Sequence, residues 1–210
     1  MIAHFRNVQS QITDMKKITK LIVAGVLFSS CSKAQKVTIG HKLGVNFATL
    51  TDVEDAESRV GLQAGGFLVY SIVEHFGISL DLVYSQQGAN SKSSNSDLHL
   101  DYIQVPLLAN IFFNEYGDDF RPKISIGPAI GFLAAAKGPF VEKDDFKSTD
   151  FGFVAGAGFN YKVGEKKWLN VDARYGMGAS EIFKEEIPGL DVKNSYFSIT
   201  AGLGFGISDE

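Results

Sequence analysis

The 210-residue sequence is poor in cysteine and proline and has no excess of positive charge. Its single cysteine, Cys31, excludes an internal disulfide framework and any metal site built from clustered cysteines. Lysine and arginine together number 20, against 24 aspartates and glutamates, so the chain offers no basic face for phosphates. Nucleic acid is therefore not an expected partner.

Aromatic residues and glycine are abundant instead. The chain has 17 Phe, 7 Tyr and 22 Gly beside only 5 Pro. This pairing is typical of many β-strands joined by tight turns, and it argues against a disordered chain or a coiled coil. Composition thus predicts a β-rich protein, either globular or inserted in a membrane.

The N-terminal segment has the layout of a secretory signal. A basic stretch, 15–20, precedes an apolar stretch, 21–28, that is too short to span a bilayer. Small and polar residues follow, and cleavage after Ala34 would leave Gln35 as the new terminus. We therefore divide the chain into an upstream extension with signal peptide, 1–34, and a barrel domain, 35–210.

Three alternatives remain open for this segment. Lipidation of Cys31 competes with plain cleavage, although Phe28 stands where a lipobox prefers leucine. A second alternative to a cleaved signal is a buried N-terminal helix of the fold. The start of translation is also open, at either Met1 or Met15. Removal of residues 1–34 moves the formal net charge from −4 to −8, so the exported chain is clearly acidic.

From Val37 onward, apolar and other residues alternate with a period of two, and no segment keeps a helical repeat. The clearest run sets Phe151, Phe153 and Phe159 on one face, opposite Gly156 and Gly158. The pattern predicts eight strands, at 37–49, 60–71, 76–87, 98–113, 121–137, 149–163, 168–181 and 195–208.

The predicted connections alternate in length. The long ones, of ten to twelve residues, are 50–59, 88–97, 138–148 and 182–193, and the short ones are 72–75, 114–120 and 164–167. Long loops at one end and short turns at the other, on an even number of strands, are typical of outer-membrane barrels. A strand of 12 residues spans about 40 Å, enough to cross the hydrocarbon layer when tilted. We therefore predict an all-β fold, an eight-stranded antiparallel up-and-down transmembrane β-barrel.

The less apolar face of these strands indicates which side points inward. It holds mostly Gly, Ser, Asn and Gln, with few and balanced charges, whereas a soluble barrel would place Lys, Glu and Thr there. Such a face suits a narrow lumen, where isolated charges are costly, so we expect ion pairs there. The candidates are Lys42, Asp81, Lys123, Asp150, Asp172 and Arg174. The apolar face is then the lipid face, with an aromatic girdle formed by Tyr70, Phe76, Tyr84, Phe113, Tyr161, Tyr175 and Phe197.

Several stretches also carry a resemblance to a known family. They are 43–50 (LGVNFATL), 84–89 (YSQQGA), 100–108 (LDYIQVPLL), 127–132 (GPAIGF), 149–152 (TDFG) and 171–175 (VDARY). In this order they resemble the outer-membrane β-barrel domain family typical of Bacteroidota, often called PorT-like. The resemblance covers nearly all of 37–207, and it implies a signal peptide, an eight-stranded barrel and residence in the outer membrane. It implies no activity. The chain departs from the usual aromatic C-terminus of such barrels, because three polar residues follow Ile207.

Candidate chemistry is sparse. His99 and Asp101 lie two apart on one predicted strand, just after Ser91, Ser93, Ser94 and Ser96, and a hydrolase or acyltransferase in a barrel mouth would use such groups. Nothing in the sequence identifies a nucleophile among these serines. The four histidines are scattered, and the acidic stretches 51–57 and 142–145 lack the spacing of a calcium loop, so we predict no metal and no cofactor.

The sequence favours a small, non-enzymatic integral outer-membrane protein, surrounded by outer-membrane lipid. Its acidic loops, 50–59, 88–97, 138–148 and 182–193, are expected to contact a partner protein of the cell envelope. The alternatives are a soluble or lipid-anchored periplasmic barrel, similar to a lipocalin, that binds a small apolar ligand, and a barrel-mouth enzyme acting on lipid.

Overall fold

A computed structural model describes residues 36–51, 53, 56–91, 97–139, 142–184 and 191–207. The predicted cleavage site at Ala34 and Gln35, the lipidation candidate Cys31 and the segment 1–34 lie outside the described residues. Among the described residues, no helix is long and apolar enough to cross a membrane.

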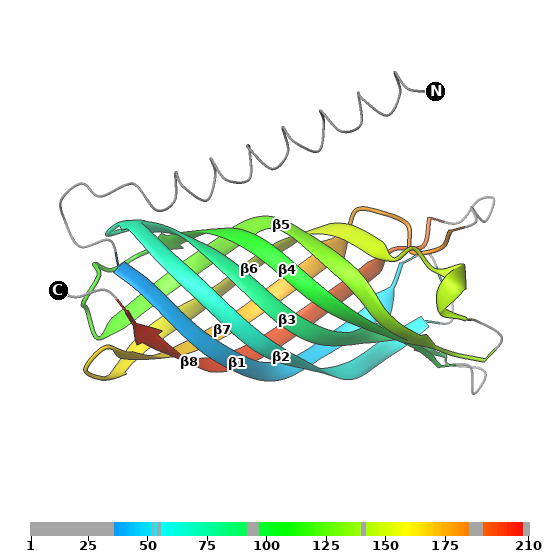
Figure 1. The fold of residues 1–210 in the computed structure, drawn as a ribbon, viewed down its shortest axis with the longest axis horizontal. Helices are drawn as coiled ribbons and strands as arrows, with labels where there is room; N and C mark the ends of the chain where they lie inside the picture. Colours follow the sequence, from blue (N-terminus) through cyan, green and yellow to red (C-terminus); the bar gives the residue numbers. More distant parts are fainter. Residues whose placement is uncertain are drawn as a thin grey trace, which may run out of the picture. The chain divides into compact units, whose positions relative to one another are not determined.

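The described chain forms a closed barrel of eight antiparallel strands, as the alternation predicts (Figure 1). Each strand pairs with the next along the chain, and β1 closes the barrel by pairing with β8, with Leu43 opposite both Ala64 and Ala201. The strands are β1 Lys36–Leu50, β2 Ala56–Val73, β3 Phe76–Ser91, β4 Leu98–Phe112, β5 Phe120–Lys137, β6 Thr149–Gly164, β7 Lys167–Gly178 and β8 Asn194–Gly206.

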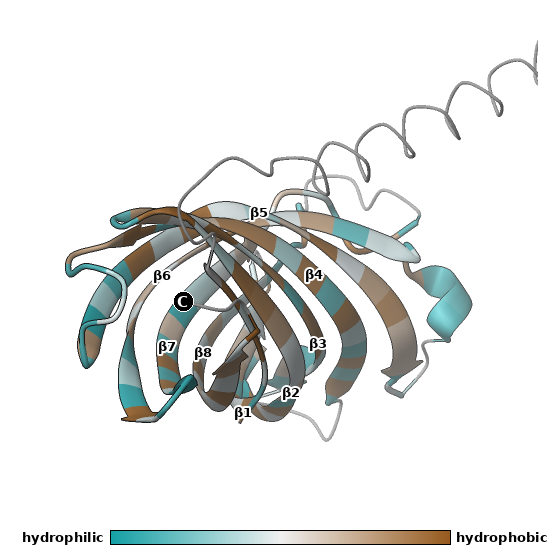
Figure 2. Cartoon of the chain, turned by 60° about the vertical axis from the view of Figure 1, so that its left-hand side comes forward, coloured by the Kyte–Doolittle hydropathy of each residue, from teal (hydrophilic) through white to brown (hydrophobic). Residues whose placement is uncertain are grey.

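The barrel places apolar side chains outside and polar side chains inside. Ile126 on the outer face is 63% exposed, whereas Asp172 in the lumen is 2% exposed. Hydrophobic and hydrophilic bands alternate along β4, for example, in Figure 2. Because exposed apolar side chains are favourable only in an apolar solvent, this distribution suits a barrel surrounded by lipid.

The outward apolar band has the height of a hydrocarbon layer. On β4 it runs from Ile103 to Ile111, continues at Phe113 beyond the strand, and so measures about 25 Å for strands tilted by about 40°. The predicted girdle residues lie on the outer face at both ends of this band, where Phe47 and Phe197 also stack with ring centroids 6.5 Å apart.

The soluble alternative is wrong for this chain. A lipocalin-like barrel holds its ligand in an apolar interior and turns polar side chains to water, which reverses the distribution seen here. The lumen instead buries Lys42, Asp81 and Arg174, while Leu43 and Leu82 are exposed on the outside.

Two of the predicted long loops are shorter than the sequence suggests. Strand β2 begins at Ala56 and β3 ends at Ser91, where these two residues still pair, so only 51–55 and 92–97 connect strands there. A bulge between Ser58 and Gln63 breaks the ladder. The other loops, 138–148 and 179–193, are the long ones, whereas the turn 113–119 exceeds the first two loops in length.

Glycines on β6 make room for charged side chains on β7. Gly156 pairs with Arg174 and Gly158 with Asp172, and all four residues face the lumen. A Cβ atom added at Gly156 would lie 2.8 Å from Cγ of Arg174, and one at Gly158 would collide with Oδ1 of Asp172. In so narrow a barrel, the charged side chains of β7 fit into the lumen only because the residues opposite them on β6 are glycines.

Candidate functional site

The lumen is the candidate site, and its centre is a cluster of five charged side chains. Lys42 on β1, Asp81 on β3, Lys123 on β5, and Asp172 and Arg174 on β7 meet there. The amino group of Lys42 lies 2.7 Å from Oδ2 of Asp81, and that of Lys123 lies 2.9 Å from Oδ1 of Asp172. The structure thus brings together five of the six residues expected to pair in the lumen.

Arg174 joins the two carboxylates. Its Nη1 donates to Oδ2 of Asp81 at 2.5 Å, and its Nη2 donates to Oδ2 of Asp172 at 2.8 Å. Charge-assisted hydrogen bonds of this kind are short and strong, and in a buried site they compensate for the water that the ions lose. The cluster therefore links strands from around the barrel and fills its middle.

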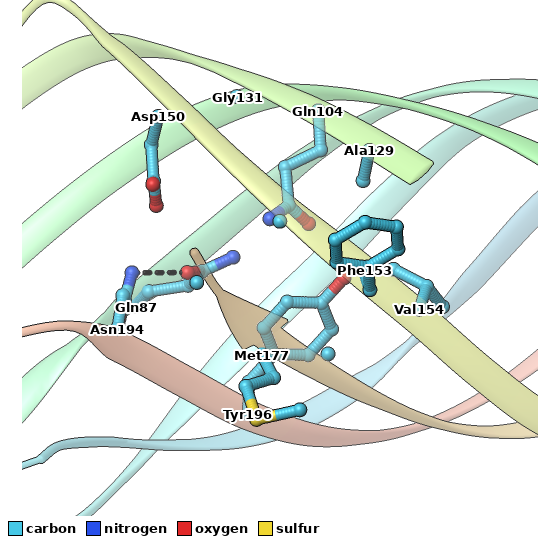
Figure 3. A pocket seen from close by; sticks show the side chains of 13 residues that line it. Gln87, Gln104, Ala129, Gly131, Asp150, Phe153, Val154, Met177, Asn194 and Tyr196 are labelled. Carbon is cyan, nitrogen blue, oxygen red and sulfur yellow. Dashed lines mark hydrogen bonds between the residues drawn. The ribbon is translucent and has the colours of Figure 1, made fainter. Parts of the chain in front are cut away.

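Asp150, the sixth expected residue, lies apart from the cluster, near the loop end. It accepts a hydrogen bond of 2.6 Å from Oγ of Ser180. Together with Gln87, Gln104, Asn194 and Tyr196 it lines a small cavity of about 20 Å³ (Figure 3). Asn194 donates to the side chain of Gln87 across this cavity. A space of this size has room for about one water molecule, not for a solute.

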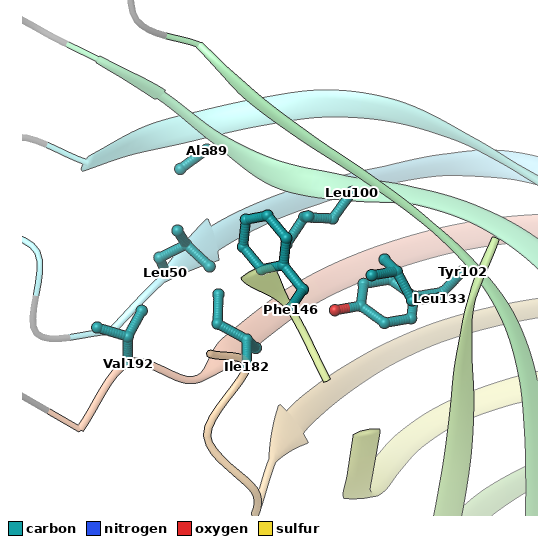
Figure 4. Packing of buried hydrophobic residues seen from close by; sticks show 8 residues of the cluster. All are labelled: Leu50, Ala89, Leu100, Tyr102, Leu133, Phe146, Ile182 and Val192. Atoms are coloured by element: carbon teal, nitrogen blue, oxygen red, sulfur yellow. The ribbon is translucent and has the colours of Figure 1, made fainter. Parts of the chain in front are cut away.

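An apolar plug closes the mouth of the barrel at the loop end (Figure 4). It consists of eight buried residues, which are Leu50, Ala89, Leu100, Tyr102, Leu133, Phe146, Ile182 and Val192. Five of them are inward residues of strands, and three come from the loops 138–148 and 179–193. Apolar side chains at a water-facing mouth are stabilised only by contact with one another, so the loops fold inward over the lumen.

Backbone hydrogen bonds hold the two long loops to each other. A short 3₁₀ turn, η1 Lys143–Asp145, precedes Phe146, which forms an isolated bridge with Phe183 and stacks on its ring at 5.1 Å. The amide of Lys147 donates to the carbonyl of Ile182 at 2.8 Å. The plug is thus part of an ordered loop layer.

A third layer closes the lumen near the short turns. The guanidinium of Arg121 lies 3.9 Å from the ring centroid of Phe112, in a cation–π contact. It also donates to the carbonyl of Glu74 at 2.6 Å. Trp168 is buried beside it, with the ring of Tyr116 at 6.1 Å. Side chains therefore block the described lumen at three heights.

The residues considered for catalysis do not face the lumen. His99 and Asp101 alternate on β4 with the buried Leu100 and Tyr102, so they share the outer face, opposite Lys137 and Ala135. Ser91 ends β3, and Ser93, Ser94 and Ser96 lie outside the described residues. Within the part of the chain that the structure describes, no three His, Cys, Asp or Glu side chains gather in a way that would hold a metal ion.

Sequence reasoning missed the plug and the Arg121 layer. A signal for the plug was present in the large apolar residues of the two long loops, among them Phe146, Ile182 and Val192. Arg121 carried no such signal, because at a strand end it is indistinguishable from a solvated charge until the turn 113–119 folds over it.

Comparison with known proteins agrees with this architecture. Neisserial surface protein A superposes with a TM-score of 0.59 at 16% identity, over 83% of this chain and 99% of that one. OprG from Pseudomonas aeruginosa gives 0.55 at 16% identity, over 84% and 97%. The outer membrane protein AlkL gives 0.51 at 14% identity, over 85% and 93%. At these identities the likeness shows the fold. No curated protein matches the chain.

The family model of the outer membrane protein β-barrel domain matches residues 28–184, about three quarters of the sequence. The matched region contains strands β1 to β7 and the central charged cluster. With its apolar outer band and closed eight-stranded barrel, the chain belongs to the outer membrane protein β-barrel domain family and resides in the bacterial outer membrane.

Proposed function

We propose that this protein is a non-enzymatic, non-conducting anchor that holds its loop layer at the cell surface for contact with a partner protein. The observation that carries the proposal is the filling of the lumen at three heights, by the plug, the charged cluster and the Arg121 layer. A barrel of eight strands has an interior that side chains just fill, and here they do. Solute passage is therefore not its task.

The loop layer has the properties of a binding platform. The amide of Thr51 donates to the carbonyl of Lys193 at 2.9 Å, and Lys147 and Ile182 are linked in the same way, so three loops are tied together. A rigid platform loses less conformational entropy on binding than free loops would. The exposed acidic residues among these loops, such as Glu142 and Asp144, favour a partner with a basic contact surface.

A photo-crosslinking amino acid placed in the loops tests this role. We expect a crosslinker at Asp144, in the loop 138–148, to capture one defined envelope protein in intact cells. A matched crosslinker at Glu165, in the turn between β6 and β7 at the opposite end, should not capture the same protein. Equal capture from both positions, or from neither, would contradict the proposed platform.

Alanine variants of His99 and Asp101 test the proposal that the protein is not an enzyme. Because His99 and Asp101 point away from the lumen, replacing both by alanine should leave the lipid composition of the outer membrane unchanged. A change in acyl-chain composition in that variant, but not in a variant with Asp97 replaced, would favour the enzyme reading.

We further propose that the chain belongs to the PorT-like group of Bacteroidota within its family. Support comes from the stretches 43–50 and 100–108, which lie on β1 and β4 and include inward residues such as Asn46 and Gln104. A profile built from that group alone should score this chain above profiles built from other eight-stranded outer-membrane barrels, and the reverse ranking would refute the assignment.

A further inference from the structure

One imidazole of the barrel faces the lipid. His41 on β1 is exposed on the outer face, between Ile39 and Leu43, which are 47% and 58% exposed. It lies four residues from Val37, at the short-turn end of the strand, which places it about 10 Å inside an apolar band about 25 Å high. Among the described outward residues of this band, away from the strand ends, His41 has the only ionisable side chain other than tyrosine.

The imidazole of His41 has no hydrogen-bond partner among the described residues. It contacts the ring of Phe205 on β8, with the ring centroids 6.4 Å apart. Its cross-strand neighbours are Gly66 on β2 and Leu203 on β8, and neither offers a polar side chain. A polar group without a partner is unfavourable in hydrocarbon, and ionisable residues at such depth usually pair. A partner for His41 therefore has to come from outside the barrel.

The glycine opposite His41 leaves a hollow in the same surface. Gly66 lies on the outer face of β2, and a Cβ atom added there would meet, beyond its own chain neighbours, only the carbonyl oxygen of Gly40, at 3.4 Å. The packing of the barrel itself therefore does not require a glycine at this position. Glycine weakens the interior of a strand and often marks a place where another backbone approaches closely.

Small side chains extend this hollow toward the middle of the band. Leu43 is the cross-strand neighbour of both Ala64 and Ala201. At interfaces within membranes, small residues allow two backbones to come close together. A surface with protruding residues beside a hollow is complementary to itself, because a two-fold axis brings His41 and Leu43 of each copy against the hollow around Gly66 of the other.

We propose that the surface around His41 and Gly66 is the interface of a homodimer in the outer membrane. A two-fold axis along the membrane normal keeps both copies in the same orientation and joins identical surfaces. A neutral imidazole has one donor nitrogen and one acceptor nitrogen, so His41 of one copy can donate to His41 of the other. A second copy thus satisfies a side chain that acyl chains cannot. The interface leaves the loop layer and the lumen free.

Energy transfer between donor-labelled and acceptor-labelled copies in phospholipid vesicles measures this association. The transfer should rise along a saturating curve with the protein-to-lipid ratio, and dilution with excess lipid should reverse it. His41→Leu should weaken the association roughly threefold to thirtyfold, the range for loss of a hydrogen bond between membrane-spanning segments. Gly66→Leu fills the hollow and should abolish the saturating transfer.

Two control variants show whether these effects belong to this surface. His41→Gln keeps a donor and an acceptor, so it should retain most of the association. Ala157→Leu enlarges a small outward residue on β6, which lies opposite β2 in the closed barrel, and should change nothing. Leucine suits the lipid face, so His41→Leu and Gly66→Leu should keep the heat-modifiable shift of a folded barrel. Loss of transfer in these variants would then not reflect loss of the fold.

Thiol crosslinking in cell membranes locates the contact. In a chain with Cys31 replaced by serine, Leu43→Cys should give a dimer with a short bifunctional thiol reagent, whereas Ala157→Cys should not. Equal crosslinking from the two positions would overturn the homodimer. So would absence of transfer at every protein-to-lipid ratio, or transfer that His41→Leu and Gly66→Leu leave unchanged. Capture of a different outer-membrane protein, and not of a second copy, by a photo-crosslinker in place of His41 would equally refute it.

Discussion

Nζ of Lys42 on β1 lies 2.7 Å from Oδ2 of Asp81 on β3, although strand β2 separates their backbones. Arg174 on β7 donates to the same oxygen at 2.5 Å. One carboxylate therefore connects three strands that are not neighbours in the sheet. These contacts cross the lumen, so the same side chains that hold distant strands together also fill the interior of the barrel.

Replacing Asp81 by Asn should destabilise the barrel by about 3–5 kcal/mol, because removal of one partner leaves buried charge uncompensated. After the change, Lys42, Lys123 and Arg174 would share the carboxylate of Asp172 alone. Urea unfolding of the protein in lipid vesicles measures the difference. Asp191→Asn, at an exposed ion pair with Lys193, is the matched control and should cost less than about 1 kcal/mol. Equal losses in the two variants would show that the cluster contributes no more than a surface pair.

Replacing Gly156 by Ala should cost about 1–3 kcal/mol through overpacking. The new Cβ would lie 2.5 Å from the backbone oxygen of Ala173 and 2.8 Å from Cγ of Arg174, so both the backbone of the strand pair and the Arg174 side chain would have to shift. Gly164→Ala is the control, because its nearest neighbouring atom, Cδ of Lys167, is 3.7 Å away. The same unfolding assay compares them, and a smaller loss for Gly156 than for Gly164 would argue against a tightly packed lumen.

Replacing Phe146 and Ile182 together by serine should release the loop layer while leaving the transmembrane strands intact. The plug would lose two of its eight buried residues, one from each long loop. We expect rapid proteolytic cleavage within 138–148 and 179–193 and an unchanged heat-modifiable shift in detergent gels. Val53→Ser, in a loop position that is 41% exposed, should leave the cleavage rate as it is. Protection of the loops in the double variant would show that the plug does not order them.

Replacing Ile126 by Arg should cost about 2–4 kcal/mol in a bilayer, the usual cost of a charge on the lipid face near the midplane. Ile126 is 63% exposed, so in a water-soluble barrel the same change would be nearly neutral. Val53→Arg in a loop controls for the added charge. Vesicle unfolding of both variants gives the comparison, and a neutral Ile126→Arg would contradict the placement of this face in lipid.

Much of this architecture follows from sequence because a period of two determines which residues share a face. Ile126 and Leu43 were assignable to the lipid face, and Lys42, Asp81 and Arg174 to the lumen, before any pairing was known. A narrow barrel forces inward charges close together. Asp150 lies apart because it is the second residue of its strand, at the loop end, a height that the predicted strand bounds 149–163 already indicated.

The loop end was less predictable for a physical reason. Beyond the hydrocarbon layer both faces of a strand contact polar surroundings, so β2 continues through Glu57 and Ser58 without an apolar alternation to mark it. The plug gathers residues far apart in the chain, such as Leu50 and Val192, into one cluster. Only the folded barrel brings them to one place.

Conductance across a planar bilayer tests the central claim, an outer-membrane barrel with a filled lumen, most directly. With the plug, the Lys42–Asp81 cluster and the Arg121 layer in place, we predict no stable conductance steps after insertion, with insertion confirmed by protease protection of the strands. Steady conductance steps of uniform size from the unmodified protein would contradict a filled lumen and, with it, the role of a non-conducting anchor.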